Sequence, residues 1–301
     1  MRLDRWFKLY YPHIPHAMLQ KHLRKGLIRV EGKKAEASAR LETGQEVRIP
    51  TFLAESQVSN PAPAKPRQAS EHLLSAIPKW VIHKDKDILA LNKPSGIAVQ
   101  GGSGVKDSID GLLDALRFGS EERPKLVHRI DKDTSGILLL ARHAKAAREL
   151  TEAFRHKETR KLYWALVAGM PERREGEIHL SLSKGGPAGR EKVSVDAKDG
   201  KKAVTLFRVV EALGKKLAWV ELEPVTGRTH QLRVHMAAIG HPIIGDGKYG
   251  GKGAFIEGMK LDGKLHLHAR SLELPERGLS LTAPLTGHMK ASWKLLGFDE
   301  R

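Results

Sequence analysis

The stretch Leu126-Val127-His128-Arg129-Ile130-Asp131-Lys132-Asp133-Thr134-Ser135-Gly136 is followed directly by an apolar run, Ile137-Leu138-Leu139-Leu140-Ala141. The apolar run is short and bounded by a glycine, which predicts a buried β-strand. The polar run then becomes a loop at the edge of a sheet, where binding and catalytic groups are often held. Its carboxylates and basic side chains make it a candidate site. A solvated turn with Asx-type hydrogen bonds is the alternative.

The composition indicates a basic protein with room for one catalytic core and a small extra domain. The chain has 301 residues, with 52 Lys and Arg against 35 Asp and Glu, and a formal charge of +17. Such a charge makes a polyanion, most simply nucleic acid, the expected partner. Cysteine is absent, which excludes disulfides, thiolate catalysis and cysteine-ligated metals. No apolar run reaches membrane-spanning length and no signal peptide is found, so we expect a cytoplasmic protein without a membrane partner.

Residues 1–54 are predicted to form a first domain with a basic surface. Helical spacing of apolar residues predicts one helix that stops at Pro12 and a second that ends at Gly26. Two strands, at 27–30 and 47–49, and a tight turn follow. Basic side chains on the second helix and in the turn can follow a phosphate backbone; they are Lys21, Arg24, Lys25, Lys33 and Lys34. A basic cap without a role in RNA binding is the alternative.

Residues 55–72 carry Pro61, Pro63 and Pro66 among small and polar residues, a composition typical of a linker. Residues 73–301 are predicted to form the larger domain. Many short strands with few helices between them predict an α+β domain with a central, largely antiparallel mixed sheet. The expected strands lie at 81–83, 88–91, 97–99, 137–141, 162–167, 178–182, 203–210 and 217–222, and the expected helices at 108–118 and 143–156.

Histidines occur close together at two places, but their pattern does not predict a metal site. His230 and His235 are five positions apart, which does not place them on one helix face, and His266 and His268 lie on an expected strand. Zinc needs three or four convergent ligands, and no cysteine is available. We therefore expect no metal, and we expect His230 to support the cleft or to contact RNA.

The run His128–Gly136 is similar to the catalytic signature of the RluA family of pseudouridine synthases, with Ile130 where that family more often has leucine. Three further motifs occur in the order of that family, so that together the four span roughly residues 80–275. They are Asn92–Gly96, Lys161–Tyr163, and Thr226–His235 with its continuation at 240–250. Residues 1–54 resemble the alpha-L RNA-binding module named after ribosomal protein S-four, with Glu31-Gly32 in place of its usual Asn-Gly.

The resemblance implies a pseudouridine synthase fold, with an active-site cleft across the central sheet. It implies that Asp131 is the catalytic residue and that Arg228 is the cation that pairs with it through its planar fork. It also implies that Tyr163 stacks on the target uracil and that Arg129 helps to extrude or replace the base. The alternatives are an Arg228 that clamps phosphate and a Tyr163 that is an ordinary strand aromatic.

These features predict an isomerase that converts specific uridines to pseudouridine in RNA. The motifs resemble the RluC-like members that act on large-subunit rRNA, so 23S rRNA is the expected substrate. The reaction rearranges bonds without oxidation, so we expect no cofactor and no metal. We also expect a monomer. The open alternatives are a tRNA pseudouridine synthase, an RNA-binding protein without catalysis, and a metal-dependent nuclease or hydrolase.

Overall fold

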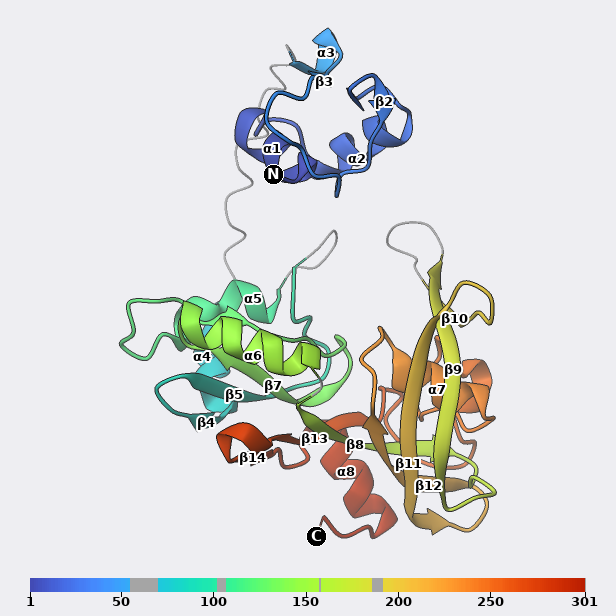
Figure 1. Cartoon of the computed structure of the whole chain (residues 1–301). Coiled ribbons are helices and arrows are strands. Elements are labelled where there is room, and N and C mark those ends of the chain that lie inside the picture. The colour runs from blue at the N-terminus through green and yellow to red at the C-terminus, as the bar shows by residue number, and fades with distance from the viewer. Residues whose placement is uncertain (55–69, 102–106, 157, 186–191, 301) are drawn as a thin grey trace. The chain divides into compact units, whose positions relative to one another are not determined.

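The structure is a computed structural model of the chain, and it describes residues 1–54, 70–101, 107–156, 158–185 and 192–300. The chain divides into two units, Met1–Gln68 and Ala69–Arg301, each with a sheet and a core of its own (Figure 1). The expected linker at 55–72 lies mostly outside the described residues. Its last two positions, 71 and 72, belong to the first turn of helix α4 (Glu71–Ala76).

The first unit combines helices with a small antiparallel sheet of strand order β2-β1-β3. Its elements are α1 (Leu3–Tyr10), α2 (His16–Arg24), β1 (Arg29–Val30), β2 (Lys33–Lys34), β3 (Val47–Arg48) and α3 (Thr51–Ala54). Leu3 and Phe7 lie one helical turn apart and are both buried in a core that also holds Leu19 and Leu23. The two expected helices are present. The first strand begins two residues later than expected, and Leu27 N donates to the carbonyl oxygen of His22 in α2 at 3.0 Å instead of to a strand.

A two-residue turn joins β1 to β2. Glu31 and Gly32 have φ angles of 49° and 70°, and Val30 pairs with Lys33 across the turn. Two successive residues with positive φ make the type I′ hairpin turn, whose twist suits antiparallel strands. The turn therefore places Lys33 and Lys34 on an exposed hairpin strand.

The second unit is organised around one large sheet. Its elements are α4 (Glu71–Ala76), η1 (Ile77–Trp80), β4 (Val81–Lys84), β5 (Ile88–Lys93), α5 (Ile109–Leu112), η2 (Leu113–Leu116), β6 (Lys125–Leu126), β7 (Ser135–Ala141), α6 (Ala144–His156), β8 (Arg160–Ala168), β9 (Glu175–Gly185), β10 (Lys192–Val195), β11 (Lys201–Leu213), β12 (Leu217–Pro224), α7 (Gln231–Ala238), η3 (Gly251–Ala254), β13 (Leu267–Leu274), η4 (Pro275–Arg277), β14 (Leu279–Thr282) and α8 (Gly287–Leu296). Among the described residues no helix has the length and apolarity needed to cross a membrane.

Most strands of this sheet follow the order β10-β9-β11-β12-β8-β13-β7-β5-β4, with β14 paired to β13 and β6 paired to β7. Where the structure describes the strands, β13 and β7 form the parallel pair and all other pairs are antiparallel. This arrangement confirms the expected α+β class with a largely antiparallel mixed sheet.

The strand that follows the polar loop lies in the middle of the core. Every residue of β7 is buried, and so is every residue of its neighbour β5. Leu138 and Leu140 pack on the face of the sheet that is covered by α5 and η2, whereas Ile137 and Leu139 pack on the opposite face with α6. The apolar run therefore forms the buried strand that its composition predicts.

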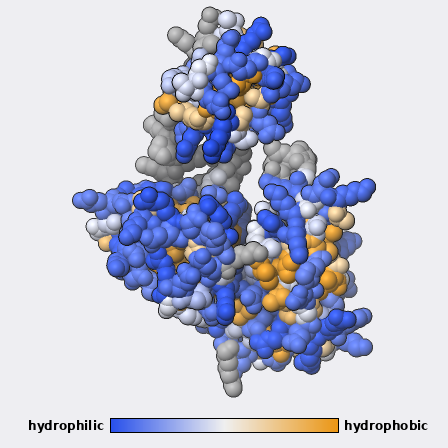
Figure 2. Space-filling model, in the orientation of Figure 1, coloured by the Kyte–Doolittle hydropathy of each residue, from blue (hydrophilic) through white to orange (hydrophobic). Residues whose placement is uncertain are grey.

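Helix α6 covers one of these faces with its apolar side. Ala146 and Leu150, one turn apart, are buried against the sheet. The surface over α6 is largely hydrophilic, while hydrophobic residues reach the surface over β9 and α7 (Figure 2).

Two local expectations in this unit are wrong. Residues 97–99 do not form a strand, and only an isolated bridge joins Ala98 to Ser108. The carbonyl oxygen of Ile97 accepts a hydrogen bond from Lys93 Nζ instead of pairing with a strand. The expected helix at 108–118 is a single α-turn, α5, that continues as the 3₁₀ helix η2 and ends at Leu116.

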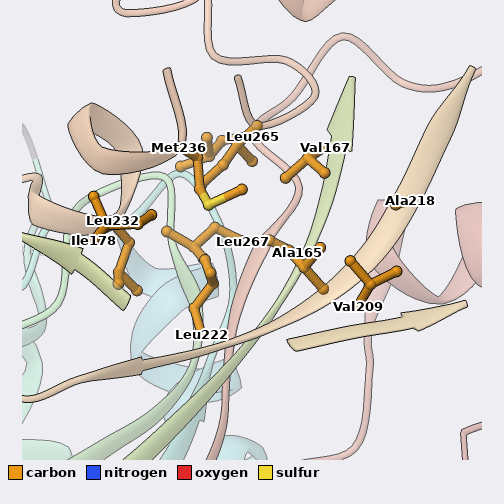
Figure 3. Packing of buried hydrophobic residues seen from close by; sticks show 12 residues of the cluster. Ala165, Val167, Ile178, Val209, Ala218, Leu222, Leu232, Met236, Leu265 and Leu267 are labelled. Carbon is orange, nitrogen blue, oxygen red and sulfur yellow. The ribbon is translucent and has the colours of Figure 1, made fainter. Parts of the chain in front are cut away.

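Helix α7 is held on the sheet by apolar contacts that position its first turn. Leu232 and Met236 belong to a buried cluster with Ile178, Leu265 and Leu267, and Figure 3 shows both side chains pointing into that cluster. These contacts fix the rotation of a helix that is buried along most of its length. They also fix the polar residues that α7 carries at its N-terminal end.

Candidate active site

The polar loop before β7 lines a cavity of about 360 Å³. The lining residues come from this loop, α6, β8, β12, β13 and the start of α7; they are His128, Arg129, Ile130, Asp131, Thr134, Phe154, Lys161, Tyr163, Pro224, Thr226, Gly227, Arg228, Thr229, His230, Gln231, Leu232, Arg233 and Leu267. Five of the sequence-predicted residues, Asp131, Tyr163, Arg228, Arg129 and His230, thus meet at one cavity.

Gly136 sets the close approach of the loop to strand β13. Its φ angle is +103°, and a Cβ atom at this position would lie 2.3 Å from the carbonyl oxygen of Ala269. Gly136 pairs with Ala269 in the parallel bridge between β7 and β13. Only glycine fits here without displacing backbone, so the end of the polar loop is fixed against the sheet.

A buried lysine holds the loop from the other side. Lys93 is fully buried, and its Nζ donates hydrogen bonds to the carbonyl oxygens of Pro94, Ile97 and Lys132 at 2.9, 2.9 and 3.0 Å. Burial lowers the pKa of Lys93 to about 7, against the raising effect of Asp133 and Asp131. The motif 92–96 therefore anchors the residue next to Asp131, a role that we did not predict from the sequence.

Asp131 faces two basic side chains from the start of α7. Arg233 Nη1 lies 3.8 Å from Asp131 Oδ2, and His230 Nε2 lies 3.7 Å from Asp131 Oδ1. The Asp131 side chain is 20% exposed, so one of its sides remains open to the cavity. Each oxygen of the Asp131 carboxylate therefore has one of these side chains beside it.

A second carboxylate orients Arg233. Asp246 accepts two hydrogen bonds from Arg233, from Nε at 2.8 Å and from Nη2 at 2.7 Å. The exposed fractions of the two side chains are 9% for Arg233 and 1% for Asp246. Burial acts to lower the pKa of Arg233, but the hydrogen bonds and the charge of Asp246 outweigh it and raise the pKa above its usual value. Arg233 is therefore a fixed cation beside Asp131.

The expected pair of Asp131 with Arg228 is not among the ion pairs of the described residues. Among the described residues, the ion pairs of Asp131 are those with His230 and Arg233. Arg228 is exposed, and its Nε donates to the carbonyl oxygen of Lys202 at 3.3 Å, although it lines the same cavity. The reason is the start of helix α7 at Gln231, which leaves Arg228 in the preceding turn. His230 and Arg233 are three positions apart and share the side that faces Asp131.

Gln231 holds that preceding turn in place. Its Oε1 accepts from Arg228 N at 3.1 Å and from Thr226 Oγ1 at 2.7 Å, and its Nε2 donates to Val204 O at 2.9 Å. A buried side-chain amide with donors and acceptors all used gives the turn one defined conformation. Gln231, Arg233, Asp246 and Lys93 are the site residues that sequence reasoning missed. A sequence signal could have found them. Each is a polar residue inside a matched motif, at a position where the periodicity of the helix or strand predicts a buried side chain.

Aromatic residues form the floor and a side of the cavity. Tyr163 lies on β8 and packs against the buried cluster of Figure 3. Burial and the negative charge of Asp131 raise the pKa of Tyr163, so its phenol stays protonated. His128 stacks on Phe154 with ring centroids 4.4 Å apart, and its Nε2 accepts from Leu139 N at 2.8 Å. Burial and the charge of Lys161 lower the pKa of His128 to about 3, so His128 is neutral.

Arg129 stands at the exposed edge of the cavity. Its Nη1 donates to Gln100 Oε1 at 3.2 Å, and most of its side chain is open to solvent. This position suits a residue that meets a substrate as it enters.

The predicted RNA-binding residues of the first unit are all exposed. Lys21 and Arg24 lie on α2, Lys25 follows it, and Lys33 and Lys34 form β2. Arg24 and Lys34 line a hollow of about 490 Å³ on the surface of this unit. The five charges therefore offer a basic surface for a polyanion.

Two other buried histidines, His266 and His268, have structural partners. His268 bonds Ser135 Oγ at 2.8 Å and Ala283 O at 3.1 Å, and His266 bonds Ser292 Oγ at 2.8 Å and Lys264 O at 2.8 Å. Across the described parts of the chain, no three His, Asp or Glu side chains are grouped in a way that could hold a metal ion.

Comparisons with known proteins find relatives over most of the chain. The family model described as RNA pseudouridylate synthase matches residues 87–238. The chain is 36% identical over 277 residues to the ribosomal large subunit pseudouridine synthase C of Rickettsia conorii, covering 92% of this chain and 89% of that protein. It is 36% identical over 295 residues to the protein of the same name from Vibrio cholerae, covering 96% and 91%. The solved structure of human RNA pseudouridylate synthase domain containing 4 superposes with a TM-score of 0.62 at 29% identity, covering 75% of this chain and 96% of that one.

Proposed function

Because this chain belongs to the RNA pseudouridylate synthase family, we propose that it isomerises uridines of 23S ribosomal RNA to pseudouridine and that Asp131 is its catalytic carboxylate. The substrate follows from the relatives that are named ribosomal large subunit pseudouridine synthase C. The observation that carries the role of Asp131 is its position, since its carboxylate opens into the cavity between His230 and Arg233.

The reaction breaks the N-glycosidic bond of uridine, turns the base and rejoins it to the ribose through carbon. An ionised carboxylate can serve this reaction as nucleophile or as base. Arg233 places a positive charge beside this carboxylate, and Asp246 fixes the position of Arg233. All atoms of the substrate are retained, so the proposal includes no redox cofactor and no metal.

The cavity offers a place for a base that has left its stack. A flipped base needs an aromatic or apolar platform and polar groups at its edge. Tyr163 supplies a ring beside Asp131, and Leu232 and Leu267 supply apolar walls. We assign Tyr163 to the stacking of the target uracil, Arg129 to the displacement of the base, and Arg228 to contact with the RNA backbone at the mouth of the cavity.

The first unit is proposed to be an RNA-binding domain of the S-four type. Its exposed residues Lys21, Arg24, Lys25, Lys33 and Lys34 can neutralise phosphates, which makes binding dependent on salt. We also propose that the protein is a monomer and that it acts in the cytoplasm.

The experiment that tests the proposed function is pseudouridine mapping of total RNA from cells with and without this protein. Cells that lack it are rescued with the wild type, with Asp131→Asn, or with Asp133→Asn. Asp133 is an exposed carboxylate in the same loop, so its variant is the matched control. We expect specific sites in 23S RNA to disappear and to return with the wild type and Asp133→Asn only. Sites that disappear from tRNA would correct the substrate, and rescue by Asp131→Asn would remove Asp131 from its role.

A further inference from the structure

We propose that Tyr249 is a positioning residue that holds His230 in its neutral form, with the ring proton on Nε2 and directed at Asp131. The inference deepens the proposed function, because it rests on Asp131 as the catalytic carboxylate. It concerns a part of the site that no sequence motif explained, namely why a histidine and an arginine both face one carboxylate.

The hydrogen bonds of the Tyr249 hydroxyl carry the inference. Val193 N donates to Tyr249 Oη at 3.2 Å, and Tyr249 Oη lies 2.6 Å from His230 Nδ1. A phenol has one proton to donate. Val193 N can only donate, so among the partners of the hydroxyl in the described residues, Nδ1 is the acceptor toward which the phenol proton can point. Nδ1 then carries the lone pair, and the proton of the neutral ring is on Nε2, 3.7 Å from Asp131 Oδ1.

Tyr249 is itself held by the turn that orients Arg233. Tyr249 N donates to Asp246 Oδ1 at 3.3 Å, and the guanidinium of Arg233 lies 5.1 Å from the centre of the Tyr249 ring. One short segment, 246–249, therefore supports both side chains that face the carboxylate. Arg233 is directed at Oδ2 and His230 at Oδ1, so the two oxygens of Asp131 have different partners.

The charges around His230 agree with a neutral ring. Asp131 faces it from the loop before β7, Arg233 from α7, and Asp246 and Lys248 from the following turn, while Lys192 of β10 lies 5.7 Å from the Tyr249 ring centre. Burial lowers the pKa of His230 below its usual value; Asp131 opposes this effect, and Arg233 and Lys248 add to it.

A neutral donor suits a catalytic carboxylate better than a second cation does. Arg233 already places one positive charge beside Asp131, and a second full positive charge would make the carboxylate a weaker nucleophile and a weaker base. A neutral Nε2–H can orient Oδ1 without that cost. Protonation of His230 should therefore slow the reaction, and Tyr249 disfavours it, because the hydrogen bond from the hydroxyl to Nδ1 is lost when that nitrogen takes up a proton.

Nitrogen-15 spectroscopy of the full chain tests the protonation state directly. His230 is identified among the 15 histidines by the signal that His230→Gln removes. We expect the wild type to show the neutral Nε2–H form at neutral pH, and Tyr249→Phe to raise the pKa of His230 by about one unit, the equivalent of one hydrogen bond. An Nδ1–H ring or an imidazolium in the wild type at neutral pH would overturn the inference.

The single-turnover rate is measured on saturating RNA at a series of pH values. If Tyr249 had only a structural role, its loss would not shift the pH dependence of this rate. We expect the acidic limb of the Tyr249→Phe profile to lie at higher pH than that of the wild type, by about one unit. A profile that is lowered equally at every pH would mean that Tyr249 acts through packing alone.

Two variants of His230 distinguish its role as a hydrogen-bond donor to Asp131 from a role in the backbone conformation before α7. A glutamine amide can take the place of Nε2–H, whereas an asparagine amide takes the place of Nδ1. His230 has a φ angle of 53°, a conformation that asparagine tolerates better than glutamine does. We expect His230→Gln to be faster than His230→Asn by about tenfold to a hundredfold, with no acidic limb of its own. A faster His230→Asn would overturn the inference and make the residue a backbone element.

Asp131→Asn is measured in the same series. If Asp131→Asn is inactive and the Tyr249 and His230 variants behave otherwise than expected, the inference fails and the proposed function stands. If Asp131→Asn keeps turnover, the proposed role of Asp131 fails independently of Tyr249.

Discussion

Arg233 and Asp246 form a bidentate ion pair that is almost completely buried, with hydrogen bonds of 2.8 and 2.7 Å and exposed fractions of 9% and 1%. The third guanidinium nitrogen, Nη1, is left to face Asp131 at 3.8 Å. The planar guanidinium of Arg233 therefore contacts two carboxylates at once. Asp246 fixes its position, and Asp131 is the carboxylate that it faces. Lysine has no such geometry.

The first prediction concerns which arginine supports Asp131. We expect Arg233→Lys to lower the single-turnover rate by at least about a hundredfold, because a lysine cannot keep two parallel bonds to Asp246 and also face Asp131. Arg228→Lys is the matched variant, and we expect it to change the rate by less than about tenfold and to leave the salt dependence of RNA binding nearly unchanged, because lysine keeps the positive charge. If Arg228→Lys were the slower enzyme, the pairing that we expected from the sequence would be the functional one.

The second prediction concerns Asp246. We expect Asp246→Ala to lower the free energy of unfolding by about 3 to 5 kcal/mol, because it leaves the buried charge of Arg233 without its partner. Urea denaturation measures this change. Asp262→Ala is the control, since Asp262 pairs with Lys264 in an exposed ion pair whose loss should cost less than about 1 kcal/mol. Equal losses for the two variants would contradict the structural importance of the buried pair.

The third prediction concerns Gly136. An alanine there would place its Cβ 2.3 Å from Ala269 O, and the backbone has a φ of +103°. We expect Gly136→Ala to lower the free energy of unfolding by more than about 3 kcal/mol and to reduce activity, because the loop must move away from β13. Gly214→Ala is the control, with a φ of +55° and no atom within 4 Å of the new Cβ, so it isolates the cost of the backbone conformation. A Gly136→Ala variant as stable as Gly214→Ala would show that the strands separate easily.

The fourth prediction concerns stability in acid. Burial lowers the pKa of His266 and of His268 to about 4 each, so both are neutral in the folded state. The unfolded chain binds protons at these groups below about pH 6.5, so the free energy of unfolding should fall as the pH decreases from about 6.5 to about 4. The stabilising contribution of these two histidines to the free energy of unfolding is fully present above about pH 6.5.

Urea unfolding at a series of pH values measures this slope. His268→Gln should be less stable at neutral pH, because it loses the bonds to Ser135 and Ala283, but its stability should depend less steeply on pH. His156→Gln is the control, because His156 is exposed and its change should leave the slope as it is. An unchanged slope in His268→Gln would mean that this histidine is already protonated in the folded protein.

Much of the fold could be predicted from local patterns. The run 137–141 is apolar throughout, and it forms a strand that is buried on both faces. The alternating strands, the two helices at the start of the chain and helix α6 also follow from periodicity, because burial of one side is imposed at every second or every third to fourth residue. Residues 97–99 could not be predicted in this way, because the ammonium group of the buried Lys93 binds the carbonyl group of Ile97 that a strand would use.

The membership of the candidate site was predictable in part, and the contacts between its residues were not. Matching motifs identified Asp131, Tyr163, Arg228, Arg129 and His230, and all five line one cavity. The motif 226–235 contains two arginines five positions apart, and its letters alone do not say which one faces Asp131. That choice depends on where α7 begins and how it is rotated.

The amino-acid sequence alone was enough to predict the class of fold, the polar loop before a buried strand, and Asp131 as the carboxylate of interest in that loop. Each of these predictions depends on residues that are close together in the chain. The partners of that carboxylate required the folded chain. Asp131, Arg233 and Asp246 come from separate segments, and they meet because Leu232 and Met236 fix the rotation of α7 against the sheet. Packing between distant segments determines which polar groups face each other. The spacing of residues within one segment does not predict these contacts.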